Sequence, residues 1–145
     1  MHELTRIVSS EERKAVETAE AVAKRLRIDT HVSPNLDEHR RPFVPAPAEF
    51  ERLMEHFFAE PHDRVFGEES ADEALARFTT AVNAVLDSEP ERNVGIVTHG
   101  TVLALYAAPI FGIGTAALWK RLQMPSFLVI DTESKRSLRI VDEIE

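Results

Sequence analysis

The sequence predicts an α/β fold in which helices cover both faces of a mostly parallel sheet, as a three-layer α/β/α sandwich that ends in an antiparallel hairpin. Short apolar runs such as Ile7–Val8 and Val94–Val97 alternate with stretches whose apolar residues recur every three or four positions, as strands alternate with amphipathic helices. Near the C-terminus, Phe127–Ile130 and Leu138–Val141 flank a polar turn, which predicts the hairpin. With 43% hydrophobic residues the chain suits one core of ordinary size, so we expect residues 1–145 to form a single domain.

The first predicted unit is a strand that passes directly into a helix. After Ile7–Val8, the order Ser9-Ser10-Glu11-Glu12 places a glutamate three residues after a serine, which is the pattern of a capping box at a helix start. The helix should end near Arg27, and its apolar face is formed by Ala15, Ala19, Val22, Ala23 and Leu26. Thr30–Val32 predicts a short edge strand, and the turn residues Ser33-Pro34-Asn35 predict a loop after it.

Two helices are predicted in the middle of the chain. The prolines of Arg40–Pro47 indicate a stiff loop inside the domain. The helix after it ends before Pro61 and carries an aromatic-rich stripe made of Phe50, Leu53, Met54, Phe57 and Phe58. A second capping box at Ser70-Ala71-Asp72-Glu73 begins the next helix, which should reach as far as Pro90.

A histidine follows a short apolar run that is predicted to be a buried strand. Val94–Val97 leads into the turn Thr98-His99-Gly100, and Thr101–Phe111 continues as an apolar helix. Ligands of open α/β sheets bind beyond the carboxyl ends of the strands, and the free N–H groups of a helix start suit an anion. Arg13 and Lys14 are cations in the first helical turn, where the helix dipole disfavours them unless they serve a ligand such as phosphate. The alternatives are a structural histidine and ordinary surface charge.

The composition excludes several classes of function. The chain carries 17 basic and 25 acidic residues, a net charge of −8, which argues against a general nucleic-acid or anionic-membrane binder. It has no cysteine, and its histidines lack the spacing of a metal-binding motif, so no disulfide, cofactor or metal is expected. We find neither an apolar stretch that could cross a bilayer nor an export signal, which predicts no membrane association and a cytoplasmic location.

Four segments, in order along the chain, resemble the histidine phosphatase superfamily, whose fold is phosphoglycerate-mutase-like. They carry two serines followed by a basic residue and a Thr-Ala pair, an acidic loop, a Gly-Glu-Ser-like helix start with a downstream arginine, and an apolar strand that ends in Ser/Thr-His-Gly. The matching residues are Val8–Glu20, Leu36–Glu38, Gly67–Ser70 with Arg77, and Val94–Gly100. The resemblance extends from about Ile7 to Ile130.

The resemblance implies a phosphate site and roles for its residues. His99 would be the second histidine of the phosphate pocket, hydrogen-bonded to the phosphoryl oxygens. Glu38 would be the general acid that protonates the leaving oxygen and then the base that activates water. Lys14 stands where the family usually has arginine, and Arg13 and the N–H of Gly100 would bind phosphate with it. Neither a metal nor a cofactor is implied.

The chain departs from the family at its start. The family's Arg-His-Gly signature, whose histidine is phosphorylated, lies at the end of a first strand that is central in the sheet and adjacent to the strand ending at His99. The 145 residues contain no such tripeptide, and His2 is not followed by glycine. We therefore expect an N-terminally shortened domain with the first strand missing, and either unpaired backbone groups or a sheet that closes up. The reading frame starts upstream, or the chain is a shortened homologue.

Two functions follow from this resemblance. The first is phosphomonoester hydrolysis or phosphoryl transfer on a phosphorylated small molecule through a phosphohistidine in the complete family, with phosphatase preferred to mutase and activity of this chain left open. The second is a non-catalytic module that binds a phospholigand or phosphate anion through His99, Lys14 and Glu38 and forms a homodimer through an exposed sheet edge. The loop residues His39–Arg41 either meet an anionic substrate or are ordinary surface charge, and we favour the second interpretation.

Overall fold

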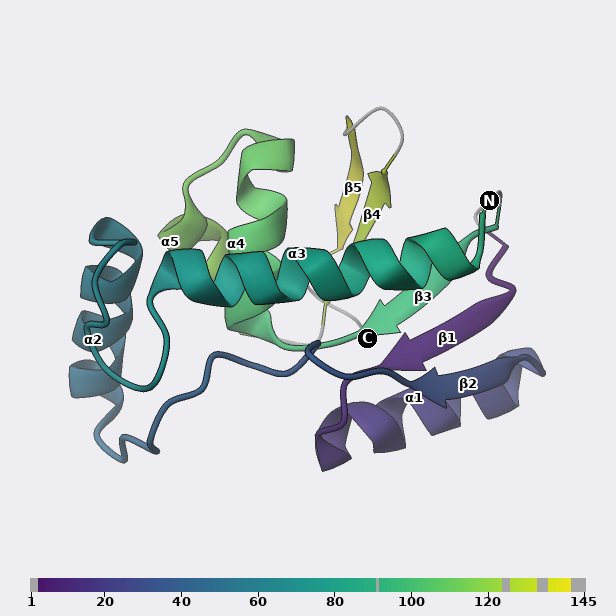
Figure 1. The fold of residues 1–145 in the computed structure, drawn as a ribbon, viewed down its shortest axis with the longest axis horizontal. Coiled ribbons are helices and arrows are strands. Elements are labelled where there is room, and N and C mark those ends of the chain that lie inside the picture. The colour runs from purple at the N-terminus through teal and green to yellow at the C-terminus, as the bar shows by residue number, and fades with distance from the viewer. Residues whose placement is uncertain (1–2, 91, 124–125, 133–135, 142–145) are drawn as a thin grey trace.

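The structure is a computed structural model that describes residues 3–90, 92–123, 126–132 and 136–141. His2 and part of the turn predicted between the last two strands lie outside these residues. Along the chain the described elements are β1 (Arg6–Ser9), α1 (Arg13–Leu26), β2 (Asp29–Val32), α2 (Pro47–Ala59), α3 (Ala71–Ser88), β3 (Val94–Val97), α4 (Gly100–Phe111), α5 (Thr115–Arg121), β4 (Phe127–Asp131) and β5 (Arg136–Val141) (Figure 1). This order confirms the predicted α/β class and the terminal hairpin. Among the described helices, none has the length and apolarity needed to span a membrane.

The parallel sheet has the strand order β2-β1-β3, and β4 pairs with β5 in a separate antiparallel hairpin. In the parallel sheet, Ile7 of β1 lies opposite Thr30 on one side and Gly95 on the other. The strand before α1 and the strand before α4 are therefore direct neighbours. Of the two expected arrangements, unpaired backbone groups or a closed-up sheet, the described strands show direct pairing of β1 with β3.

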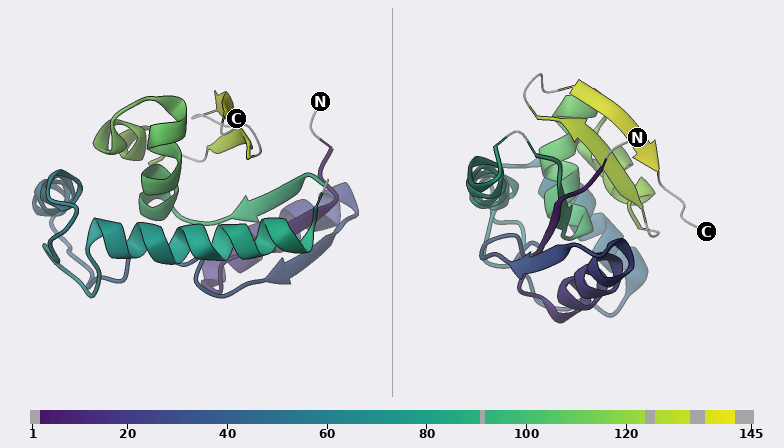
Figure 2. Two further views of the ribbon diagram at one scale, coloured as in Figure 1. Left: turned by 45° about the horizontal axis from the view of Figure 1, so that its top comes forward. Right: turned by 90° about the vertical axis from the view of Figure 1, so that its right-hand side faces the viewer.

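Helices lie on both faces of this sheet (Figure 2). The small side chains of Ala19 and Ala23 let α1 pack closely against Ile7, in a cluster that Val97 extends. On the other face, Val8 joins the main core with residues of α2, α3 and α4. Its largest fully buried side chains include those of Phe57, Phe78, Met54, Leu36 and Leu118.

The two predicted helix starts have different outcomes. At α3 the capping box is present: the Ser70 Oγ accepts from the Glu73 N–H at 3.1 Å, and the Glu73 carboxylate accepts from the Ser70 N–H at 2.9 Å. At α1 the prediction of a capping box is wrong, because the N-cap residue is Glu12 and no side chain caps the helix. The Ser10 hydroxyl contacts His99 instead.

A turn at Gly67 connects α2 to α3. Gly67 has a φ of 82°, and a Cβ at this position would lie 2.4 Å from the Arg40 carbonyl oxygen. The Glu68 N–H donates to the same carbonyl at 2.7 Å. Glycine is therefore needed here for both its φ and its lack of a side chain. The turn also fixes the position of the loop that contains Arg40 and the site residues near it.

Because β1 and β3 are parallel, their carboxyl ends meet at one edge of the sheet. The Ser10 N–H donates to the Val97 carbonyl at 3.1 Å, which extends the pairing one residue beyond β1. His99 follows Val97 by two residues and forms the N-cap of α4. The fold thus places Ser10 and the start of α4 together, as expected for a ligand site of an open α/β sheet.

Candidate functional site

His99 lies at the centre of a cluster of polar side chains. Its Nε2 is 2.7 Å from the Ser10 Oγ and 2.9 Å from an Oε of Glu12, and its side chain is only 15% exposed. A carboxylate has only acceptor atoms, so the contact with Glu12 places a proton on Nε2. His99 therefore presents a hydrogen-bond donor to an anion at this point, which is the role that the resemblance implies.

The carboxylate of Glu38 lies at the N-terminus of α4. Its Oε2 accepts from the Thr101 N–H at 3.0 Å, and its Oε1 accepts from the Val102 N–H at 3.1 Å. These amides have no acceptor inside the helix, and the helix dipole favours negative charge beside them. A carboxylate from the chain thus occupies an anion-binding helix terminus.

Glu12 connects the two parts of the cluster. Besides its contact with His99, its Oε2 accepts from the Glu38 N–H at 2.8 Å. The Ser10 Oγ, on a fully buried residue, also accepts from the Glu12 N–H at 3.3 Å. Neither residue is among the predicted site residues, because the pattern of Ser9–Glu12 predicts a helix cap. The position of Ser10 at a strand end was the available signal.

Arg41 brings a guanidinium to the same helix terminus. It donates to the Thr101 Oγ1 at 3.2 Å, lies 3.9 Å from Glu38 Oε2 and packs over the ring of Phe50 at 4.9 Å. Burial lowers the pKa of Arg41, against the opposing charges of Glu38 and Glu12, yet an arginine stays charged in proteins. The preferred interpretation of Arg41 as surface charge is therefore wrong.

The neighbours of Arg41 in the loop lie behind the site: the His39 N–H donates to the Glu38 carboxylate at 3.0 Å, and the His39 Nδ1 lies 3.4 Å from Arg41 Nη1. His39 is buried, its Nε2 hydrogen-bonds to the Glu69 carbonyl at 3.0 Å, and its ring packs on Phe57 with a centroid distance of 4.3 Å. Burial lowers the pKa of His39, which favours a neutral ring. Arg40 pairs with Asp37 on the surface.

The predicted cationic phosphate ligands lie outside this cluster. The Arg13 side chain is 91% exposed and pairs with Glu17 one turn along α1. Lys14 is also exposed and makes no hydrogen bond or ion pair with any described residue. Gly100, by contrast, is the first residue of α4 and directly follows His99. The structure brings together His99, Glu38 and Gly100, while Lys14 and Arg13 remain predictions.

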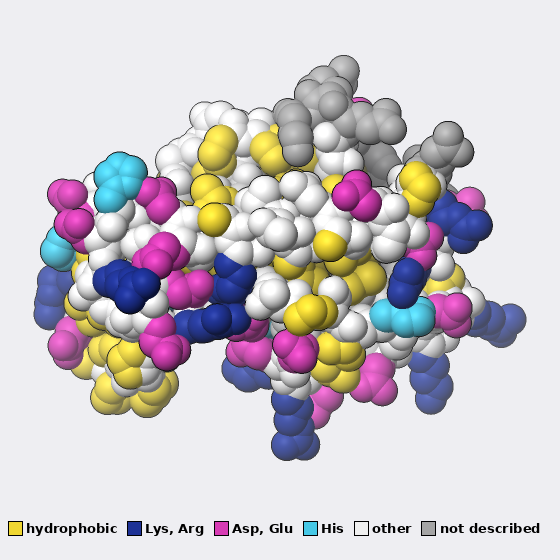
Figure 3. Space-filling model, viewed as in Figure 1, with side chains coloured by type: hydrophobic (Ala, Val, Ile, Leu, Met, Phe, Trp, Pro, Cys, Tyr) yellow, Lys and Arg dark blue, Asp and Glu magenta, His cyan; other side chains and the backbone are white. Residues whose placement is uncertain are grey.

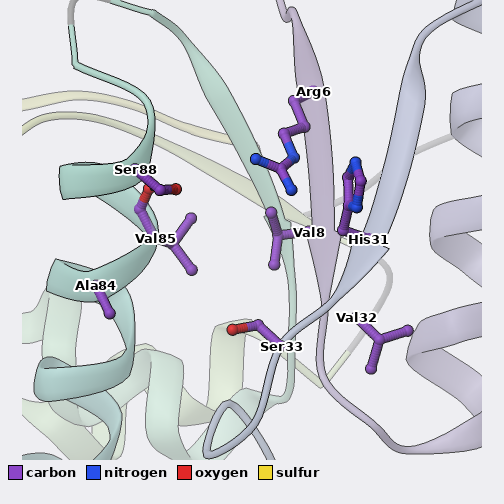
Figure 4. Close-up of a pocket in the computed structure, with 8 residues that line it drawn as sticks. All are labelled: Arg6, Val8, His31, Val32, Ser33, Ala84, Val85 and Ser88. Carbon is purple, nitrogen blue, oxygen red and sulfur yellow. The ribbon is translucent and has the colours of Figure 1, made fainter.

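A separate hollow of about 210 Å³ lies between the sheet and α3 (Figure 4). It is lined by Arg6, Val8, His31, Val32, Ser33, Ala84, Val85 and Ser88. The set contains neither His99 nor Glu38, so this hollow is not the anion site. On the same side of the molecule, Lys and Arg side chains are interspersed with Asp and Glu (Figure 3). Within the described ranges, no group of three or more His, Cys, Asp or Glu side chains could hold a metal ion.

Comparisons with known proteins identify the family and the fold. The sequence model of the histidine phosphatase superfamily (branch 1) matches residues 1–141. No protein of curated function matches the chain. Among solved structures, YhfR of Bacillus stearothermophilus has a TM-score of 0.67 and 24% identity over 99% of this chain and 76% of its own.

Two mycobacterial structures are also similar. Glucosyl-3-phosphoglycerate phosphatase in complex with inorganic phosphate has a TM-score of 0.68 and 22% identity over 95% of this chain and 75% of its own, and it was also solved with VO3. Mycobacterial hydrolase 2 has a TM-score of 0.63 and 23% identity over 81% of this chain, which spans 56% of its length. At these identities the structural similarity establishes the fold alone.

Proposed function

The chain belongs to the histidine phosphatase superfamily, and on that basis we propose that the N-terminus of α4 binds the phosphate group of a small phosphomonoester. One observation carries the proposal: the Glu38 carboxylate already accepts hydrogen bonds from the amides of Thr101 and Val102, at 3.0 and 3.1 Å. A helix N-terminus binds carboxylates and phosphates through the same N–H groups. The phosphate-bound form of the mycobacterial phosphatase supports a ligand of this kind.

Each residue of the cluster has a chemical role in this proposal. His99 donates from Nε2 to a phosphoryl oxygen, and Arg41 balances the negative charge that develops as the ester P–O bond breaks. Protonated Glu38 gives its proton to the leaving oxygen. In the complete family the signature histidine accepts the phosphoryl group as this bond breaks, and the same carboxylate then takes a proton from the water that cleaves the phosphohistidine. When phosphate binds at the helix terminus, the Glu38 side chain leaves the two amides, while its backbone stays in place beside the site.

Hydrolysis also requires a nucleophile for the phosphoryl group. The family uses the histidine of its Arg-His-Gly signature and forms a phosphohistidine, and the 145 residues contain no such tripeptide. The proposal for these residues is therefore phosphate binding and protonation of the leaving group. Phosphatase activity through a phosphohistidine belongs to the complete family site. We favour a phosphatase over a mutase.

The second candidate is a non-catalytic phospholigand-binding module. Two carboxylates of the chain, those of Glu12 and Glu38, occupy donors that a substrate phosphate would use, which favours this alternative. In the parallel sheet β2 is an edge strand, and through this edge the module would form a homodimer.

The first test combines phosphate binding with hydrolysis. Inorganic phosphate should shift the NMR amide resonances of Thr101 and Val102, and His99→Ala should weaken this binding, while the control His62→Ala should not, because His62 is exposed. Hydrolysis of p-nitrophenyl phosphate that is lost in His99→Ala and kept in His62→Ala would support the phosphatase. Binding without turnover would support the module. Absence of both would refute the site.

A further inference from the structure

Arg77, on α3, holds the loop that carries Glu38. Its side chain is 10% exposed, and its guanidinium donates to three carbonyl groups of the loop backbone. The acceptors are the carbonyl oxygens of Asn35 at 3.1 Å, Asp37 at 2.8 Å and Glu38 at 3.3 Å. One side chain thus satisfies loop carbonyls that no regular secondary structure pairs.

Glu69 fixes the guanidinium from the other side. Its two carboxylate oxygens accept from Arg77 Nε and Nη2, both at 2.8 Å, in a bidentate pair, and the Glu69 side chain is also 10% exposed. Burial acts to raise the pKa of Glu69, but the hydrogen bonds from Arg77 and from the Arg40 N–H outweigh it and lower the pKa. Glu69 therefore stays ionised, and a bidentate pair orients the guanidinium plane.

The loop between these contacts has one further anchor. Leu36 is fully buried, and its carbonyl accepts from the Thr98 Oγ1 at 2.7 Å. At Glu38 itself, the carbonyl points to Arg77 while the carboxylate reaches the amides at the start of α4. The guanidinium therefore fixes the backbone from which the proposed acid projects.

We propose that Arg77 is a positioning residue, which keeps the Glu38 carboxylate within reach of the α4 N-terminus by holding the carbonyls of Asn35, Asp37 and Glu38. The inference rests on the proposed function of Glu38 as the proton donor. It also gives the Gly67–Ser70 segment a role, because Glu69 within this segment is the counter-ion of Arg77. Arg77 itself does not contact the reacting atoms.

The test replaces both members of the pair, because a single change leaves a buried charge without its partner. The variant is Arg77→Gln with Glu69→Gln, and the control is Arg64→Gln with Glu73→Gln, which removes an ion pair that is more exposed. With the Glu38 cap released, exchange of the Thr101 and Val102 amide hydrogens should become about tenfold faster in the first variant and stay unchanged in the control. The Val8 amide, inside the sheet, reports whether the fold is intact. Unchanged exchange at Thr101 and Val102 would overturn the inference.

A second measurement compares hydrolysis rates of phosphate esters with different leaving groups. A purely structural role of Arg77 would not change the ratio of these rates. The p-nitrophenolate ion needs little help from an acid to leave, whereas the alkoxide of an alkyl phosphate needs a proton. The variant should therefore lose alkyl phosphate hydrolysis at least about tenfold more than p-nitrophenyl phosphate hydrolysis. Equal losses would contradict the inference. If the unmodified chain shows neither phosphate binding nor turnover that depends on His99, the proposed function fails, and the exchange of the amides still decides the role of Arg77.

Discussion

Replacing Glu12 with glutamine should tighten the binding of phosphate at the α4 N-terminus. The Glu12 carboxylate contacts His99 Nε2 at 2.9 Å, where a bound phosphoryl oxygen would need the same donor. Glutamine has nearly the same shape, and its amide oxygen can still accept from the Glu38 N–H. Glu12 is the N-cap of α1 but makes no side-chain cap, so the substitution should leave the helix start unaffected.

The size of the effect follows from the charge that is removed. A phosphate bound to His99 would lie about 4 Å from this carboxylate, where two unit charges repel by about 1 kcal/mol in water and about 4 kcal/mol at the effective dielectric constant of a protein surface. The Glu12 side chain is 46% exposed, so solvent screens much of the repulsion. We take about 1–2 kcal/mol, which corresponds to a Kd lower by about 5- to 30-fold.

The assay is an NMR titration with inorganic phosphate that follows the amides of Thr101 and Val102. Glu11→Gln is the matched control, because Glu11 is exposed and its replacement changes the net charge by the same amount. We expect Glu12→Gln to bind phosphate more tightly than both the unmodified chain and the control. An equal gain in the two variants would mean that only net charge matters. A weaker affinity in Glu12→Gln would refute the view that Glu12 competes with phosphate.

Two further predictions concern stability. Gly67→Ala should lower the free energy of unfolding in urea by about 2 kcal/mol or more, because a Cβ there would lie 2.4 Å from the Arg40 carbonyl oxygen at a φ of 82°. The control is Gly114→Ala, where no atom lies within 4 Å of the added Cβ. It should change this free energy by less than about 0.5 kcal/mol. Because the folded-state pKa of Glu69 lies below the ordinary glutamate value of 4.5, its pairing with Arg77 stabilises the protein above that pH, and this stabilisation is lost as the pH falls through the lowered pKa. Glu69→Gln should therefore be less stable than the unmodified chain at pH 7, and urea unfolding at a series of pH values should show this difference shrinking below about pH 4.5.

The periodic and capped parts of the chain were predictable from the sequence. The capping box at Ser70 and the stripe of α3 depend on contacts between residues three or four apart, so local sequence specifies them. The same rule gave a wrong prediction at Ser9–Glu12, where the Ser10 hydroxyl contacts His99 and does not cap the helix. Local propensity cannot detect a partner that lies 89 positions along the chain.

The site was predictable only in part for the same reason. His99 and Glu38 carry their motifs in sequence and do meet at the start of α4. Arg41 could not be separated from Arg40 by sequence, because both are arginines in one loop. The loop conformation decides between them, turning Arg41 to Thr101 and Arg40 to Asp37.

The contact between Glu12 and His99 is a consequence of how the sheet closes. Neighbouring strands lie about 4.8 Å apart, and β1 pairs directly with β3, with Ser9 opposite Val97. A further strand between them would separate the ends of β1 and β3 by about 9.6 Å, too far for the 2.7 Å contact from Ser10 to His99. Direct pairing therefore brings Ser10 and Glu12 into contact with the His99 imidazole, which would otherwise be free to bind a ligand. The Glu12→Gln titration tests this sheet arrangement as well as the site, because Glu12 can compete with phosphate only while β1 and β3 are neighbours.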